Sequence, residues 1–221
     1  MKKNFIVSGI MRKALLMVFV LCFCVFSTFA SKSWFGIEGF TTRSEETRIY
    51  NLLGIDFSED STATVMGIAV SGTLFPNQES PLGIGYQIGA GKIIEATQGS
   101  SQEDVSDYPL TWRGSLSIQY GATFTEQLSM ELGVGGLYES MTRGADSNNP
   151  EVIVEYNMLS FIANTKLLFK MSDSLAILGG LSVSTPLSSE TTVTSGSISY
   201  GSYINVIGYT ILGQLGLALS L

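Results

Sequence analysis

The sequence predicts an all-β protein, namely an eight-stranded antiparallel up-and-down transmembrane β-barrel preceded by a cleaved signal peptide. Three observations predict it. From Ser33 onward the residues alternate with a period of two. Short and long connections alternate between the predicted strands. The face opposite the bulky apolar residues is mostly Gly, Ser and Ala. We therefore expect the bulky face to meet lipid and the small face to line the lumen.

The amino-terminal segment, residues 1–30, predicts a secretory signal peptide. Four basic residues (Lys2, Lys3, Arg12 and Lys13) precede the apolar run Ala14–Phe26, and Thr28-Phe29-Ala30 follows it. The run is shorter than the roughly 20 residues of a membrane-spanning helix, which makes an uncleaved anchor the weaker alternative. Both cysteines, Cys22 and Cys24, lie inside the run, so the barrel domain at 31–221 has neither a disulfide nor a thiol.

Eight strands follow from the alternation. The pattern is strongest at Tyr108–Phe124, where Leu116, Ile118 and Tyr120 share one face and Ser117 and Gln119 the other. The predicted strands are Ser33–Thr42, Ser61–Phe75, Leu82–Ile94, Tyr108–Phe124, Leu128–Met141, Val152–Phe169, Leu175–Thr185 and Ser202–Leu221. The short connections are 76–81, 125–127 and 170–174, and the long ones are 43–60, 95–107, 142–151 and 186–201. Barrels in outer membranes have short periplasmic turns and longer external loops.

Aromatic residues on the bulky face lie near the strand ends, as two interfacial girdles require. Trp112, Tyr138 and Tyr203 lie toward the long loops, and Phe35, Phe124 and Phe169 lie toward the short turns. A soluble barrel of the lipocalin kind is the alternative, since it also has eight alternating strands. It would need a charged outer wall, yet only 14% of the residues are charged, against about a quarter in typical globular proteins.

Composition excludes several functions. The chain contains no histidine, which removes the usual general base and the commonest metal ligand. Four of the 12 basic residues lie in the predicted signal peptide and none of the 19 acids does, so the mature chain is acidic and would repel nucleic acid. We therefore expect no enzymatic activity, no catalytic residue, no cofactor, no metal site and no nucleic-acid partner.

The chain resembles the small outer-membrane β-barrels of the OmpW, OmpX and OmpA-barrel type. The resemblance rests on the signal peptide, the eight alternating strands, turns such as Phe124–Leu132, and a last strand with apolar residues at alternate positions up to Leu221. It implies insertion by the barrel-assembly machinery into the outer-membrane lipid, with both termini in the periplasm. For OmpW-type proteins it also implies a slender passage or cavity for a small or apolar molecule.

Charged residues on the small face are the nearest approach to a site. Centring the fourth connection on Glu126 sets Arg113 opposite Glu139. Glu131 lies three residues after the start of the fifth predicted strand and Lys166 three residues before the end of the sixth, so the two could meet near the periplasmic end. Glu38 could join either pair. One interpretation is that these ion pairs satisfy charges inside a narrow barrel. The other is a polar gate that a solute must break.

The small face is rich in glycine, and this admits two interpretations. Glycine eases the strong curvature of a small barrel. Alternatively, the residues leave a slender passage open. They include Gly83, Gly85, Gly89, Gly91, Gly133, Gly135, Gly180, Gly208 and Gly216.

The first long connection is unusually apolar. It contains Ile49, Tyr50, Leu52, Leu53, Ile55 and Phe57. We expect these residues to cap the barrel mouth, because a cap hides the most apolar surface from water. They could instead lie on the lipid interface, contact a partner, or add two strands to make ten.

The sequence thus predicts a non-enzymatic integral outer-membrane β-barrel, with a structural role or a role as a narrow conduit for small or apolar solutes. A surface adhesin that acts through its long loops and a soluble lipocalin-like ligand carrier are the alternatives.

Overall fold

The computed structural model describes residues 33–52, 55–77, 79–106, 108–143, 152–195, 198–203 and 205–221. The predicted signal peptide at 1–30 lies outside the described residues. None of the described residues belongs to a helix long and apolar enough to span a membrane.

Ten strands form one antiparallel sheet. They are β1 Trp34–Leu52, β2 Ile55–Leu74, β3 Leu82–Gln98, β4 Ser101–Gln102, β5 Thr111–Thr123, β6 Leu128–Arg143, β7 Val152–Lys170, β8 Leu175–Ser195, β9 Ile198–Tyr203 and β10 Asn205–Ser220.

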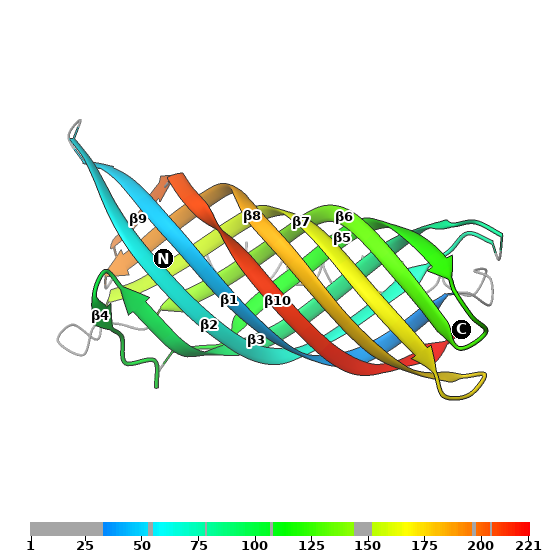
Figure 1. The fold of residues 1–221 in the computed structure, drawn as a ribbon. Helices are drawn as coiled ribbons and strands as arrows, with labels where there is room; N and C mark the ends of the chain where they lie inside the picture. Colours follow the sequence, from blue (N-terminus) through cyan, green and yellow to red (C-terminus); the bar gives the residue numbers. More distant parts are fainter. Residues whose placement is uncertain are drawn as a thin grey trace.

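Eight of these strands close into a barrel. Each of β1, β2, β3, β5, β6, β7, β8 and β10 pairs with the next in that order, and β10 pairs with both β8 and β1. The strands tilt across the long axis, as closure requires (Figure 1). The two-residue β4 pairs with β3 alone, and β9 continues the line of β10 beside the end of β8. The predicted fold class is confirmed, with eight strands in the ring.

Side chains on the two faces are distributed as the sequence predicted. Leu116, Ile118 and Tyr120 point outward and are 65%, 64% and 51% exposed, whereas Ser117 and Gln119 between them are buried in the interior. Apolar outward residues on all eight barrel strands form a band bounded by Trp112 and Tyr138 near one end and by Phe35, Phe124 and Phe169 near the other. A soluble carrier would expose this wall to water, so the lipocalin alternative is not supported.

Two predicted loops are strands, which corrects the sequence analysis. Most of the connection expected at 43–60 is strand, since β1 runs to Leu52 and β2 starts at Ile55, and the two are paired to each other. The connection expected at 186–201 is largely strand as well, since β8 runs through Pro186 to Ser195. Crossing a bilayer takes only about 9–11 residues of tilted strand, whereas β1 has 19 and β8 has 21. The barrel therefore extends well beyond the lipid on the long-loop side.

The short turns lie together at the opposite end. The Phe124 N–H donates to the Leu128 carbonyl at 2.9 Å, and the Met171 N–H donates to the Leu175 carbonyl at 2.8 Å. The two ends of the described chain meet there too, since the Leu221 N–H donates to the Ser33 carbonyl at 2.8 Å. This end is the one that the sequence analysis assigned to the periplasm.

Candidate functional site

The two predicted charge pairs face each other across neighbouring strands. Arg113 on β5 is paired with Glu139 on β6, and their closest atoms, Arg113 Nη1 and Glu139 Oε1, are 3.7 Å apart. Glu131 on β6 is paired with Lys166 on β7. All four side chains point into the barrel and are almost completely buried. Glu38 on β1 is also buried, and it interacts electrostatically with both Arg113 and Lys166.

Glu131 is the centre of a cross-barrel hydrogen-bond network near the turn end. Its Oε1 accepts the indole N–H of Trp34 at 2.6 Å, and its Oε2 accepts the hydroxyl of Thr73 at 2.6 Å. The ammonium group of Lys166 lies 5.0 Å from the centre of the Trp34 ring, which is within cation–π range. One carboxylate therefore joins β6 to β1 and β2 on the far side of the lumen.

Amide side chains fill the next level. Gln87 donates to Glu38 and, at 3.1 Å, to Gln214, while Gln119 donates to Ser117 at 2.7 Å and to Asn164 at 3.0 Å. We call these two levels together the polar seal. Its members are Trp34, Glu38, Thr73, Gln87, Gln119, Glu131, Lys166 and Gln214.

The interior glycines do not leave the lumen bare, which corrects the interpretation of an open glycine-lined passage. A Cβ on Gly133 would collide with the side chain of Gln119, and a Cβ on Gly121 would lie 2.8 Å from the Phe75 ring. These glycines thus make room for large side chains from other strands, whereas a Cβ on Gly208 or Gly216 would collide with the backbone of β1. Phe75 and Gln119 are 2% and 1% exposed, so the turn end of the lumen is filled. A cavity of about 110 Å³ remains next to these buried side chains, between Trp34, Phe75 and the turns.

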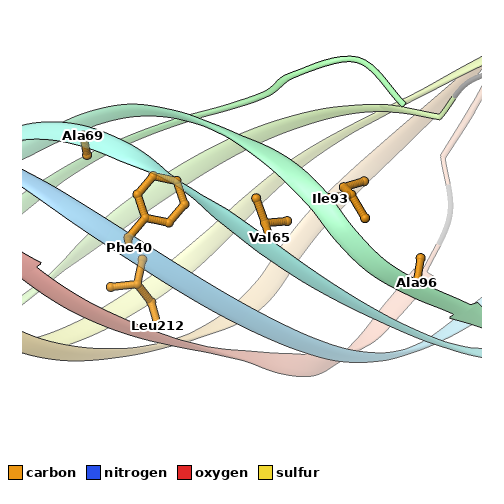
Figure 2. Packing of buried hydrophobic residues seen from close by; sticks show 6 residues of the cluster. All are labelled: Phe40, Val65, Ala69, Ile93, Ala96 and Leu212. Atoms are coloured by element: carbon orange, nitrogen blue, oxygen red, sulfur yellow. The ribbon is translucent and has the colours of Figure 1, made fainter. Parts of the chain in front are cut away.

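Toward the long-loop end, a cluster of buried apolar side chains lies on the side of the interior formed by β1, β2, β3 and β10. Other strands contribute buried polar side chains at this end, such as Arg113, Ser160 and Thr191. Phe40 of β1 and Leu212 of β10 lie next to Val65 and Ala69 of β2, and Ile93 and Ala96 of β3 continue the surface toward the long-loop end (Figure 2). Two residues of the segment before β5, Val105 and Tyr108, pack against this cluster. We call the six residues of Figure 2 the apolar lining.

A second ion pair was missed in the sequence analysis. Arg48 Nη2 lies 3.3 Å from Glu46 Oε2, and the guanidinium group of Arg48 lies 4.3 Å from the centre of the Tyr156 ring. Glu46 and Arg48 were placed in a loop. Their two-residue spacing on one strand face is the signal that would have directed both side chains inward.

The residues expected to cap the mouth do not form a loop. Ile49, Tyr50, Leu52, Ile55 and Phe57 belong to the paired ends of β1 and β2, and Leu53 lies outside the described residues. The hairpin projects beyond the neighbouring strands (Figure 1). The expectation of a loop folded over the mouth is therefore wrong. These residues form strands because pairing β1 with β2 satisfies the backbone N–H and C=O groups that a loop would leave to water.

The pairing between β8 and β10 is interrupted within the described part of the barrel wall. Their ladder ends at Ser184 and Thr210, and pairing resumes only with β9, at Glu190 and Tyr203. In between, the described residues 185–189 and 205–209 form no ladder with each other. We call this interval the ladder break.

Local sequence explains the ladder break. Pro186 has no N–H to donate. On the other edge of β8 the register against β7 shifts between Leu159 and Ser160, which leaves Leu187 as an extra residue. A side-chain bond from the Thr185 hydroxyl to the Gly208 carbonyl, at 3.2 Å, crosses the break. The outward side chains at its edges, Leu187 and Ile207, are 66% and 65% exposed.

Two features of this arrangement bear on how a solute could cross the wall or the lumen. The polar seal obstructs a straight path along the barrel axis. The ladder break leaves residues 185–189 and 205–209 without backbone pairing to each other.

Comparisons with known proteins agree with this fold. No protein-family model matches the chain, and no curated protein does. The outer membrane protein OprG from Pseudomonas aeruginosa is 12% identical, with a TM-score of 0.63, and the alignment covers 87% of this chain and 97% of OprG. A major outer membrane protein from Thermus thermophilus is 13% identical with a TM-score of 0.50, covering 83% and 99% of the two chains.

A third similar structure is that of the outer membrane protein AlkL in DMPC lipid bilayers. It is 17% identical, with a TM-score of 0.50, covering 86% of this chain and 90% of AlkL. At such low identities the similarity is one of fold. The fold is that of the small outer-membrane β-barrels, which the sequence predicted.

Proposed function

We propose that this chain, which has the fold of the small outer-membrane β-barrels, is a non-enzymatic conduit that passes small apolar solutes from outside a double-membrane bacterium into the outer membrane itself. In this proposal residues 1–30 are removed on export, the barrel-assembly machinery inserts residues 31–221, and both termini face the periplasm. The solute enters the apolar lining from the long-loop end and leaves sideways.

The ladder break is the observation that carries the proposal. Where two strands of the ring form a ladder, separating them would break its backbone hydrogen bonds, and unpaired backbone groups facing lipid each cost several kcal/mol. Between residues 185–189 and 205–209 there is no ladder to break. The wall can therefore part here with the loss of the Thr185–Gly208 side-chain bond. The exposed Leu187 and Ile207 give the exit apolar edges.

The polar seal supports the direction of this path. A solute that moved straight down the axis would have to replace buried hydrogen bonds at 2.6 Å to Glu131 and would reach Phe75. An apolar solute offers no hydrogen bonds in return, so the lateral exit is the less costly route.

A cysteine staple across the ladder break tests the proposal. Leu187→Cys and Ile207→Cys would be opposite each other if the β8–β10 register continued, and the barrel domain has no other cysteine. We expect oxidation to reduce ethylbenzene uptake to that of cells without the protein, and reduction to restore it. Ile177→Cys with Leu217→Cys, a directly paired position of the same ladder, is the matched control and should leave uptake unchanged. Full uptake through the stapled barrel would refute the lateral exit.

The projecting hairpin favours a second candidate, a surface adhesin. The paired ends of β1 and β2 extend beyond the other strands (Figure 1), and the sequence of these ends includes Ile49, Leu52 and Phe57. Shortening the hairpin tip would then abolish attachment to a host surface and leave ethylbenzene uptake intact.

A further inference from the structure

A segment outside the barrel strands packs against the apolar lining. Between β4 and β5 the chain leaves the sheet, and there Val105 and Tyr108 pack against the lining. Both side chains are half-buried, whereas Ile93 and Ala96 of the lining are 1% and 0% exposed. An apolar solute therefore reaches the lining only after part of the protein moves. We call the described residues 103–106 and Tyr108 the strap.

The strap lies beside a stretch of β3 that has no neighbouring strand on that side. β5 pairs with β3 only up to Gly91, and the two-residue β4 pairs with β3 only from Thr97. Residues 92–96 of β3 thus form no ladder on this side with any described strand. The ammonium group of Lys92, on the outer face of this stretch, donates to the Ser106 carbonyl at 2.9 Å. Separating the strap from β3 would therefore break no ladder.

Hydrogen bonds inside the strap hold it together as a unit. The Tyr108 hydroxyl donates to Glu103 Oε2 at 2.8 Å, and the Ser106 N–H donates to Asp104 Oδ1 at 3.0 Å. At the start of the strap the Glu103 N–H donates to the Ala96 carbonyl at 2.9 Å, which anchors it to β3. With an anchor at one end and bonds of its own, the strap can move as one piece, as locally opening segments of proteins do.

We propose that the strap is a movable cover, which closes the long-loop end of the apolar lining and moves aside to admit an apolar solute. In the closed state Val105 and Tyr108 occupy apolar surface on which a solute would pack. When the strap moves, the solute replaces these two side chains, so the lining is not left to water. This inference rests on the proposed function, because it names the step that regulates entry into the conduit.

A reversible cross-link between the strap and β3 tests the proposal in cells. Lys92→Cys and Ser106→Cys are joined by a bis-methanethiosulfonate reagent, whose disulfides can be reduced again. The barrel domain has no other cysteine. We expect cross-linking to reduce ethylbenzene uptake to that of cells without the protein, and reduction to restore it. The matched control joins Thr62→Cys to Thr97→Cys, at hydroxyl groups 2.8 Å apart on the paired β2 and β3, and should leave uptake unchanged.

Thiol modification measures the movement of the strap without a solute. Ile93→Cys places a cysteine in the covered lining, and a water-soluble maleimide modifies it in lipid nanodiscs. Replacing Val105 and Tyr108 by serine should raise the modification rate about tenfold, because the lost apolar burial shifts the opening equilibrium by that order. Ser101→Ala with Gln102→Ala, on the exposed β4, is the matched control and should leave the rate unchanged.

Two outcomes would overturn the inference: full uptake through the cross-linked strap, or an unchanged modification rate at position 93 in the serine variant. The cross-link leaves Val105 and Tyr108 in place, so a misfolded serine variant does not block the test. Failure of the proposed function has a different signature. In that case the stapled ladder break keeps full uptake, while the serine variant still speeds modification at position 93.

Discussion

Replacing Glu131 by alanine is expected to lower the free energy of unfolding by about 3–5 kcal/mol, the loss typical of removing one partner from a buried charged pair. The substitution leaves the Trp34 indole N–H and the Thr73 hydroxyl without their acceptor, each of which now donates at 2.6 Å. It also leaves Lys166, which is 4% exposed, without the carboxylate on the paired strand. The substitution therefore removes the carboxylate that joins β6 to β1 and β2 inside the lumen.

Equilibrium unfolding in urea, with the protein in phospholipid bilayers, measures this effect. Glu126→Ala is the matched control, because Glu126 lies in the exposed turn five residues away and makes none of these contacts. Its effect should stay within about 0.5 kcal/mol, as for most surface substitutions. A Glu131→Ala loss of the same small size would mean that the polar seal contributes little to stability.

Arginine in place of Ile118 is expected to cost about 2–4 kcal/mol, the penalty for a basic side chain on the lipid face at the bilayer midplane. Ile118 is 64% exposed on the outer face of β5. It lies midway between Trp112 and Phe124, which mark the two ends of the apolar band on this strand. The guanidinium group would have to reach past several residues of apolar wall to find water.

The control for this effect is the same substitution at a different depth in the bilayer. Leu110→Arg places the same side chain just before β5, beyond Trp112, at a position that is 54% exposed. There the penalty should fall to about 0–1 kcal/mol, as it does near the interface. The same unfolding assay measures both variants. Equal losses at 110 and 118 would contradict the position of the bilayer.

The sequence was most informative where lipid contacts one face. Along Thr111–Thr123 every outward residue meets lipid or its interface, so the apolar alternation is nearly continuous and the strand was predicted within three residues of its bounds. The pairing of Arg113 with Glu139 was predictable too, because a tight turn fixes the register of the two strands that it joins.

Beyond the bilayer the same strands lack the alternation of apolar and polar residues. From Arg43 to Arg48 both faces of β1 are polar, since neither touches lipid, and the strand reads as a loop. Residues 188–195 of β8 behave in the same way. The hydrogen bonds of the ladder hold these segments in strands, and ladder bonds leave no periodicity in the sequence.

The filling of the lumen was the least predictable part. The glycines opposite bulky residues left two interpretations open, an easing of the barrel's curvature and a hollow interior. Phe40, Phe75 and Gln119 occupy space that some of these glycines leave. Contacts such as Trp34 with Glu131 cross the lumen between residues 97 positions apart. Neither alternation nor turn geometry specifies which side chains meet across a barrel, because both describe only neighbouring strands.

Oxygen accessibility of spin labels along β5 tests the orientation of the wall most directly. Single cysteines at each position from 112 to 120 are labelled, and the barrel is reconstituted in lipid bilayers. Oxygen collisions should be most frequent at Trp112, Gly114, Leu116, Ile118 and Tyr120, and least frequent at the positions between them. Maxima at Arg113, Ser115, Ser117 and Gln119 would place the bulky face inside and contradict the account.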